Sequence, residues 1–462
     1  MNSNRKGNNL SNLVIRYEKM LENKNEIFFD SFEFEDIVDF YIEKGKYSEA
    51  MICSDFAFNQ FPFSSNFPIK KAQILTILER VDEAEKELNI AESLEPINPD
   101  LFVAKGSLLS KDKKHTSALK FFYKAKDISD NSSEILPFIA FEYQSMGKYV
   151  KTIKYLSEFL KYEPLDEMSL FNISFCFEKL KKYDEGIMFF ENHIEINPYS
   201  DISWYHLGLL QNKIKNYKLA IESFSYSIII NESFTAAYHE KAKNYSLIEN
   251  YEQAIKTYLE TFKYENTSGY TFLKIGICYK NLTLYKEAIK FFKKSCSEDP
   301  QLSEAWMEIA ICNDKLNFLD ESIYYVKKAI SLNPDDTNYI LIQTKILVRA
   351  NLYSEAILGF EKLIKLGVNE PNIWIEYAKL MFKISETHKA IKILKTGLNF
   401  HYKNSDLLFN LGIYMQIDGN IDIAKKYLIR AISLDPNLTE KIFSKIPLLR
   451  KDLDFSNFDN TQ

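Results

Sequence analysis

Residues 269–302 read GYTFLKIGICYKNLTLYKEAIKFFKKSCSEDPQL, with small, large and proline residues at defined positions. The small residues Gly276 and Ala288 let two antiparallel helices approach at the short end of the usual interaxial range of about 8 to 10 Å. Large residues such as Phe272 fill the space between the helices. Pro300 fixes φ and lacks an N–H, so it ends the second helix and starts a turn. The stretch therefore predicts a helical hairpin.

The same pattern recurs in twelve consecutive rows of 34 residues, from Ser31 to Leu438, without an insertion. Counted from the start of each row, the eighth and twentieth columns hold mostly small residues, and all three tryptophans stand in the fourth. Such a fixed period indicates a solenoid, in which each hairpin buries its apolar face by stacking on its neighbours. The predicted units are 31–64, 65–98, 99–132, 133–166, 167–200, 201–234, 235–268, 269–302, 303–336, 337–370, 371–404 and 405–438.

These columns together resemble the tetratricopeptide repeat, whose pattern is tryptophan, leucine, small, tyrosine, alanine, phenylalanine, alanine, proline. Residues 201–234 carry the pattern as Trp204, Leu207, Gly208, Ala220 and Phe224. They depart from it at Gln211, where tyrosine is expected, and at Glu232, where proline is expected. The resemblance implies an all-α fold, a right-handed superhelical α-solenoid of antiparallel helix pairs.

The two ends of the array carry their own helical signals. We expect residues 1–30 to form a polar tail and a short capping helix, and 439–450 to form a C-terminal capping helix before a polar tail at 451–462. One face of the first capping helix would be apolar, with Leu10, Val14, Tyr17 and Leu21. This helix either shields the edge of the first unit, as the ends of a solenoid require, or docks a partner.

Charge and composition narrow the function. The chain has 58 basic and 64 acidic residues and a net charge of -6, which predicts no binding to nucleic acid or to an anionic membrane. Neither a secretory signal nor an apolar run of 18 residues is present, so we expect no membrane insertion and a cytoplasmic protein. The segments outside the repeats are each shorter than the roughly 40 residues that a domain needs. We therefore expect no enzyme.

Cysteine and histidine usage gives no sign of a cofactor or metal site. The five cysteines form no C-x-x-C pair, and the six histidines show no paired i, i+4 spacing. Three cysteines, Cys176, Cys278 and Cys312, share the tenth column, which favours a packing role for their thiols. We expect neither a bound metal nor a cofactor.

The family resemblance also implies where a ligand binds. In tetratricopeptide arrays the first helix of each unit lines a concave groove, which columns two, five, nine, twelve and thirteen usually face. In units four to six these columns include an apolar stripe: Pro137, Phe141, Phe171, Phe175, Tyr205 and Leu209. Exposed aromatic clusters mark interaction sites, although a tight superhelix would instead bury the same side chains against neighbouring helices.

A second candidate patch is basic. In units nine to eleven the groove columns include Lys315, Lys345, Arg349, Lys379 and Lys383. In the groove columns, acidic residues outnumber basic ones by six to three in the first six units, and basic residues outnumber acidic ones by seven to three in the last six, which predicts a polarised groove. The patch is either a solvated helix face or a site for an acidic segment or a C-terminal carboxylate. Column five contains no lysine, which argues against the chaperone clamp known in some family members.

Two functions remain open from these observations. The first is a scaffold or adaptor that binds a peptide or helix of a partner protein in its concave groove, an acidic one if the basic patch is the site. The second is a structural subunit that assembles with itself or inside a larger fixed complex.

Overall fold

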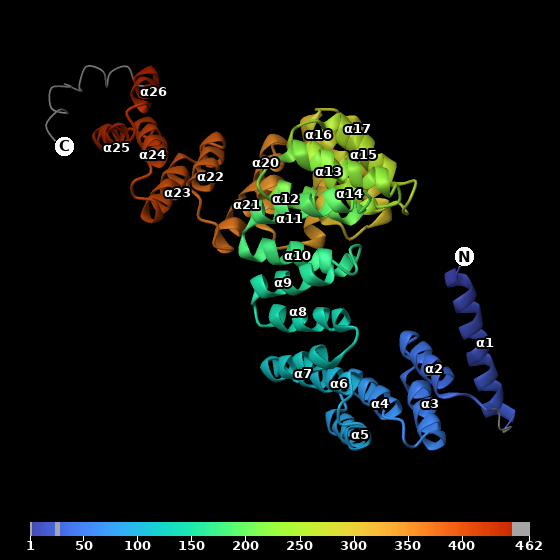
Figure 1. Cartoon of the computed structure of the whole chain (residues 1–462). Coiled ribbons are helices and arrows are strands. Elements are labelled where there is room, and N and C mark those ends of the chain that lie inside the picture. Colours follow the sequence, from blue (N-terminus) through green and yellow to red (C-terminus); the bar gives the residue numbers. More distant parts are fainter. Residues whose placement is uncertain (1, 24–27, 446–462) are drawn as a thin grey trace. The chain divides into compact units, whose positions relative to one another are not determined.

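The computed structural model describes residues 2–23 and 28–445, and every regular element within them is a helix (Figure 1). The chain divides into two compact units, residues 1–244 and residues 245–462, and helix α14 (Thr235–Leu247) contains the division. From here on, "first unit" and "second unit" mean these two parts, and "predicted unit" means a repeat of 34 residues. The expectation of an all-α solenoid is confirmed, because the helices follow one another as tandem antiparallel pairs.

The first unit begins with a single helix and continues with pairs. Its helices are α1 (Asn2–Asn23), α2 (Ser31–Glu43), α3 (Tyr47–Gln60), α4 (Asn66–Ile77), α5 (Val81–Leu94), α6 (Pro99–Lys111), α7 (His115–Ile128), the short 3₁₀ helix η1 (Ser132–Ile135), α8 (Leu136–Ser145), α9 (Tyr149–Phe159), α10 (Glu167–Leu180), α11 (Tyr183–Ile196), α12 (Asp201–Lys213) and α13 (Tyr217–Ile230).

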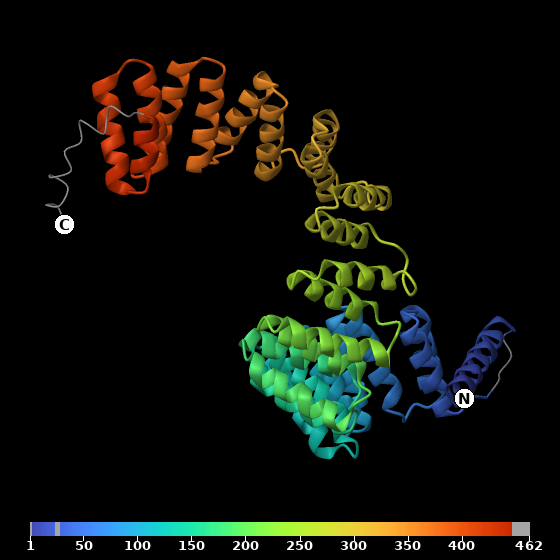
Figure 2. The same cartoon turned by 90° about the horizontal axis from the view of Figure 1, so that it is seen from above.

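The second unit continues the same alternation and ends with a short helix. Its helices are α15 (Tyr251–Thr261), α16 (Gly269–Asn281), α17 (Tyr285–Glu298), α18 (Ser303–Lys315), α19 (Leu319–Leu332), α20 (Thr337–Arg349), α21 (Tyr353–Lys365), α22 (Pro371–Lys383), α23 (Thr387–Phe400), α24 (Ser405–Ile417), α25 (Ile421–Leu434) and α26 (Leu438–Lys445). Figure 2 shows the orange and red pairs, α22 with α23 and α24 with α25, side by side.

A single left-handed residue turns the chain between the two helices of each pair. Positive φ recurs every 34 residues, at Gly45, Glu79, Lys113, Gly147, Lys181, Lys215, Glu249, Thr283, Asn317, Asn351, Ser385 and Gly419. The second helix then begins two residues later, for example at Tyr47 and Tyr149. Most of these turn residues carry a side chain, although the left-handed conformation favours glycine.

The helices of a pair interlock through the eighth and twenty-fourth columns. A Cβ atom added to Gly106 would lie 2.6 Å from a ring carbon of Phe122, and one added to Gly208 would lie 2.7 Å from Phe224. Both phenylalanines are buried. Glycine thus makes room for the largest side chain across the pair, because close-packed interiors leave no spare volume.

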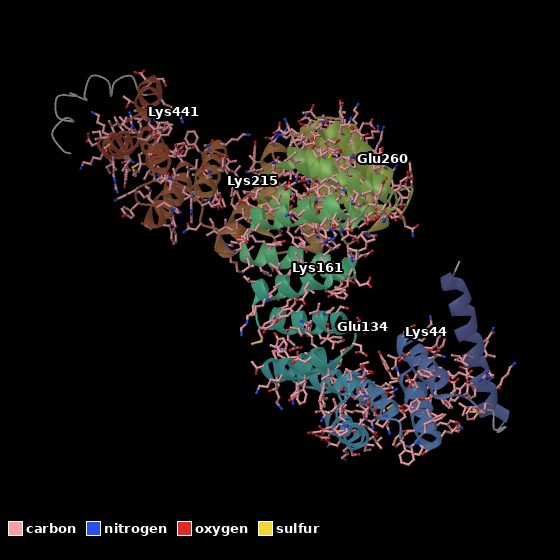
Figure 3. The ribbon with its side chains drawn as sticks, viewed as in Figure 1. Lys44, Glu134, Lys161, Lys215, Glu260 and Lys441 are labelled. Carbon is pink, nitrogen blue, oxygen red and sulfur yellow. The ribbon has the colours of Figure 1, made fainter. Side chains whose placement is uncertain are left out.

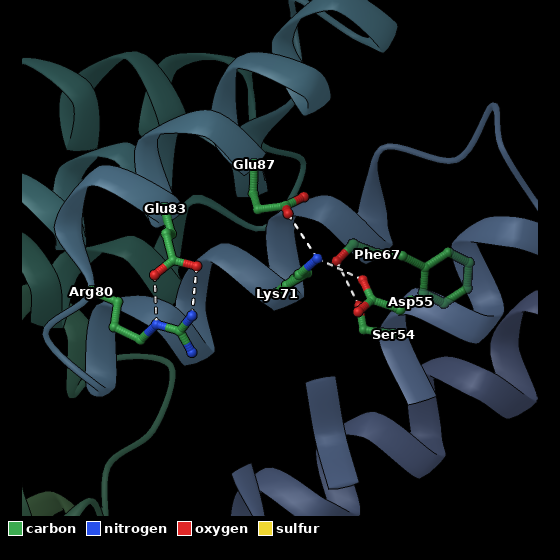
Figure 4. A network of polar contacts seen from close by, with 7 residues as sticks. All are labelled: Ser54, Asp55, Phe67, Lys71, Arg80, Glu83 and Glu87. Carbon is green, nitrogen blue, oxygen red and sulfur yellow. Dashed lines mark hydrogen bonds and ion pairs between the residues drawn. The ribbon is translucent and has the colours of Figure 1, made fainter. Parts of the chain in front are cut away.

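The second predicted unit carries Lys71 in a column that is mostly apolar in the other units. Its Nζ atom lies 2.6 Å from Asp55 and 2.8 Å from Glu87, so two neighbouring helices supply carboxylates (Figure 4). Burial alone would lower the pKa of Lys71, but these two carboxylates outweigh it and raise the pKa. The ion pairs compensate for the loss of an apolar contact at this position.

The N-terminal helix α1 packs on the first pair, α2 and α3. It therefore shields the edge of the first repeat, which was one of the two alternatives for this helix. Tyr17 is buried and makes edge-to-face contacts with Phe34 of α2 and Phe56 of α3. The expected apolar face is partly wrong, because Leu21 is 44% exposed and Met20 is buried in its place. The i, i+3 spacing from Tyr17 to Met20 places both side chains on the packed face.

At the other end, α26 lies on the last pair. Ile442 is fully buried, and the ammonium of Lys441, labelled in Figure 3, lies 4.9 Å from the ring centre of Phe409 on α24. The expected capping helix at 439–450 extends beyond the described residues, as does the expected tail at 451–462.

Candidate functional site

The predicted apolar stripe lies on α8, α10 and α12, all first helices of their pairs. Phe141 is 58% exposed and Phe171 is 55% exposed, so both present their rings to solvent. Gln144 of α8 donates a hydrogen bond to Asn172 of α10 at 3.1 Å, which shows that these helices are neighbours. The sequence therefore placed two large aromatic side chains correctly on an exposed surface of adjacent helices.

The other residues of the stripe are partly covered. Phe175 packs edge to face on Tyr149 with ring centres 6.2 Å apart, and Leu209 is half-buried. Tyr205 contacts Phe224 and Phe234, and burial raises its pKa to about 12. Part of the stripe is thus exposed, as an interaction site requires, and part is covered by neighbouring helices.

Two exposed apolar side chains on the same helices escaped the sequence analysis. Phe138 is 42% exposed on α8 and Met168 is 67% exposed on α10, each three residues before an exposed phenylalanine. Residues at i and i+3 are neighbours on a helix surface. We define the apolar patch as Phe138, Phe141, Met168 and Phe171. Met168 stands in groove column two, so the column pattern contained a signal for it.

The second helices of the first unit bear apolar hollows that the groove columns did not indicate. A cavity of about 350 Å³ lies between α9 and α11, with Val150, Met188 and Phe189 in its lining. A second, of about 440 Å³, lies between α11 and α13 beside Trp204 and Tyr226. None of the residues that line these two hollows stands in a groove column.

The basic patch of the second unit surrounds a cavity. Lys345 and Arg349 on α20, with Lys379 and Lys383 on α22, line a hollow of about 360 Å³. Lys345 and Lys379 both stand in column nine, and the other two cations stand in column thirteen. They come together because successive first helices stack in register. Lys315, the fifth predicted cation, is exposed on α18 and is not part of this lining.

Between these cations the cavity has an apolar floor. Phe360 is 1% exposed and Leu380 is 2% exposed, and Val348 completes the floor. We define the basic cavity as the hollow bounded by the four cations, by Glu376 and by this floor. A ligand that enters it meets positive charge at its rim and apolar surface at its base.

Intramolecular partners hold most of the cations in place. Arg349 pairs with Asp314 at 2.5 Å, and Lys379 pairs with Glu376 at 2.7 Å. The Lys383 ammonium lies 5.1 Å from the ring centre of Tyr353. Lys345 is exposed and has no carboxylate partner among the described residues. The basic cavity thus combines positioned cations with one lysine available for a ligand.

A neighbouring cavity of about 470 Å³ shares Lys345 and Glu376 with the basic cavity. Leu341 and Ile373 contribute apolar surface to it, and Asn372 contributes an amide. The two hollows adjoin along α20 and α22, so an extended segment could contact both.

The cysteines are placed as packing residues. All five are buried free thiols, and burial raises the pKa of Cys53 to about 12 and that of Cys176 to about 11. Within residues 2–23 and 28–445, no three potential metal ligands gather at one site. In the same residues, no helix has the length and hydropathy to cross a membrane.

Comparison with known proteins identifies the repeat. The family model "Tetratricopeptide repeat" matches residues 270–302 and 405–438, two of the predicted units. The comparison with curated proteins found no match. The predicted resemblance to the tetratricopeptide repeat is thereby confirmed at the level of the family model.

Three solved structures, two of them described as TPR proteins, are similar to parts of the chain. The C-terminal part of such a protein from Cytophaga hutchinsonii is 18% identical and aligns with a TM-score of 0.47, covering 52% of this chain and 99% of that one. YrrB, described as a TPR protein with an unusual peptide-binding site, is 17% identical over 38% of this chain and 91% of that one, with a TM-score of 0.33. MamA is 20% identical over 36% of this chain and 98% of that one, with a TM-score of 0.34.

Proposed function

We propose that this tetratricopeptide repeat protein is a non-enzymatic scaffold or adaptor that binds a segment of a partner protein along its first helices. Proteins with these repeats generally mediate protein–protein interactions. The observation that carries the proposal is the basic cavity, where Lys345, Arg349, Lys379 and Lys383 surround an apolar floor.

The chemistry of the basic cavity favours a segment that carries both acidic and apolar side chains. Carboxylates would pair with the rim cations in charge-assisted hydrogen bonds, which are stronger than neutral ones. An apolar side chain of the segment would leave water when it packs on this floor and would gain free energy from its own burial, since Phe360 and Leu380 are already buried. In the first unit, Phe141 and Phe171 are suited to act as aromatic anchors, because a few such residues usually dominate binding energy.

Variants on the two faces of the array test this function. We would capture partners with the tagged full chain from its native cytosol, beside a variant with Phe141→Ala, Phe171→Ala, Lys345→Glu and Lys379→Glu. A matched control carries Val150→Ala, Met188→Ala, Lys392→Glu and Lys395→Glu on second helices. We expect the first variant to lose partners at unchanged melting temperature and the control to keep them. Loss of the same partners from the control alone would contradict the proposal.

A structural subunit remains a second candidate because of the apolar surface outside the groove. In the first unit, Met188 is 62% exposed, Ile196 is 79% exposed and Tyr199 is 84% exposed. Exposed apolar side chains of this kind suit a permanent interface. Under this candidate, light scattering across a concentration series would give a constant mass of two or more copies. A monomer mass throughout would exclude self-assembly.

We further propose that the protein works in the cytoplasm. The five buried thiols support this location, because free cysteines persist in a reducing compartment.

A further inference from the structure

We propose that the acidic segment 452–462 of this chain binds the basic cavity of the same chain and competes there with partner segments. This inference rests on the proposed function, since it names an occupant for the same site and a means of regulating it.

The composition of the segment matches the basic cavity. Residues 452–462 read DLDFSNFDNTQ and contain three aspartates and no basic residue. Leu453, Phe455 and Phe458 alternate with these charges, so carboxylates and large apolar side chains are close together in sequence. The basic cavity offers cations around an apolar floor, which is the complementary arrangement.

The segment also has the reach to enter the cavity. Contacts connect the first helices of the second unit, since Phe382 of α22 stacks on Tyr414 of α24 at 4.4 Å and Lys441 of α26 covers Phe409 of α24. Two steps between helix axes, of about 10 Å each, separate α26 from α22. A chain of 17 residues, the length of 446–462, spans up to about 56 Å. The segment is therefore long enough to reach Lys383 on α22 and to cross to α20.

Tethering makes such an intramolecular contact effective. A segment tethered to its site is present at a local concentration of up to about the millimolar range, so even a weak contact competes with free ligands. Lys345 supplies a cation that no carboxylate of the described residues neutralises. We therefore expect the full chain to bind an acidic peptide at least about tenfold more weakly than a chain that lacks the segment.

Fluorescence anisotropy with a labelled peptide of residues 452–462 tests the inference. The peptide is titrated with the full chain, with a chain that ends at Lys451, and with a full chain carrying Asp452→Asn, Asp454→Asn and Asp459→Asn. The shortened chain is also tested with Lys345→Glu and Lys379→Glu, beside the control Lys392→Glu and Lys395→Glu on α23. Circular dichroism confirms that each protein is folded.

The inference predicts that the peptide binds the shortened chain and the asparagine variant at least tenfold more tightly than the full chain. The reversal at Lys345 and Lys379 should abolish binding, and the control should preserve it. Equal affinity for full and shortened chains, or no binding to the shortened chain, would overturn the inference. A doubled mass for the full chain that shortening removes would also overturn it, because the segment would then occupy a second copy.

A library of acidic peptides with aromatic residues separates this inference from the proposed function. If library members bind the shortened chain through Lys345 and Lys379 while the 452–462 peptide does not, the groove function stands and the intramolecular contact is rejected. If neither the library nor the 452–462 peptide binds any form, both proposals fail.

Discussion

His206 is a titratable side chain enclosed among aromatic rings. It is 4% exposed, its ring stacks on Phe190 with centres 5.6 Å apart, and Phe171 lies across it at 5.9 Å. Its Nδ1 atom has no hydrogen-bond partner among the described residues. Burial disfavours the charged form and lowers the pKa of His206 to about 4.

This burial predicts a loss of stability in mild acid. Between pH 6.5 and about pH 4, His206 is protonated in the unfolded chain but not in the folded chain. The free energy of unfolding therefore decreases as the pH is lowered through this range. We expect the free energy of unfolding to drop by about 2 kcal/mol between pH 7 and pH 5 relative to His206→Phe. Hydrogen exchange of α10 to α12 at both pH values measures this difference. The contribution of His193 is the same in the parent and in the variant, so it cancels when the two are compared. Parallel pH profiles would show that His206 is not excluded from water.

Turn residues with positive φ provide a second test. Lys181 ends α10 in the left-handed conformation, with φ of 55°, where glycine pays no Cβ penalty. We expect Lys181→Gly to raise the free energy of unfolding by up to about 1 kcal/mol. Gly147 occupies the same column in the preceding hairpin, with φ of 69°, and Gly147→Ala should have the opposite effect. Urea unfolding measures both; a stabilised Gly147→Ala would contradict this reading of the turn.

Side-chain exposure was only partly predictable from the sequence. Groove columns identified Phe141 and Phe171, which are exposed, and equally Phe175 and Tyr205, which are partly covered. The difference depends on local neighbours: Tyr149 covers one face of Phe175, and Phe234 covers Tyr205. A repeat pattern averages over such neighbours and cannot distinguish them.

At the scale of helix pairs, small and large residues compensate each other across the interface. Where the eighth column holds glycine, as at Gly276, the twenty-fourth holds phenylalanine in most pairs, as at Phe292. Where it holds alanine, as at Ala140, the partner is smaller in most pairs, as at Leu156, although Tyr258 stands opposite Ala242. The sequence showed both columns, but their direct contact became evident only in the structure.

This compensation predicts a coupled pair. Gly276→Ala should cost about 1 to 3 kcal/mol, because the added methyl group would overlap the ring of Phe292. Phe292→Leu removes that overlap and recreates the combination found at Ala140 and Leu156. We expect the double variant to be at least about 1 kcal/mol more stable than the sum of the single changes predicts. Strictly additive losses in thermal unfolding would contradict a direct contact.

The terminal helices show what the period could not predict. The pattern indicated that a helix precedes the repeats, but it placed Leu21 on the packed face, and Met20 is buried instead. Outside the array no repeated column fixes the rotation of a helix. Its orientation depends on contacts such as that of Tyr17 with Phe34.

For the molecule as a whole, regular stacking turns a sequence interval into a surface. Residues 34 positions apart stand on neighbouring first helices, which is why Lys345 and Lys379, with Arg349 and Lys383, meet around one cavity. The sequence predicted this grouping of cations. It did not predict the apolar floor, since Phe360 belongs to a second helix and its access to the surface depends on the space left between α20 and α22.

Site-specific photocrosslinking tests most directly whether the first helices bind partner segments. A photoreactive residue would replace Phe171 or Lys379 on first helices, and Met188 or Lys392 on second helices, in four separate full-length proteins. After irradiation in native cytosol, we predict that partner peptides crosslink to positions 171 or 379 and not to 188 or 392. Crosslinks confined to the second-helix positions would contradict a groove function and favour assembly through the opposite face.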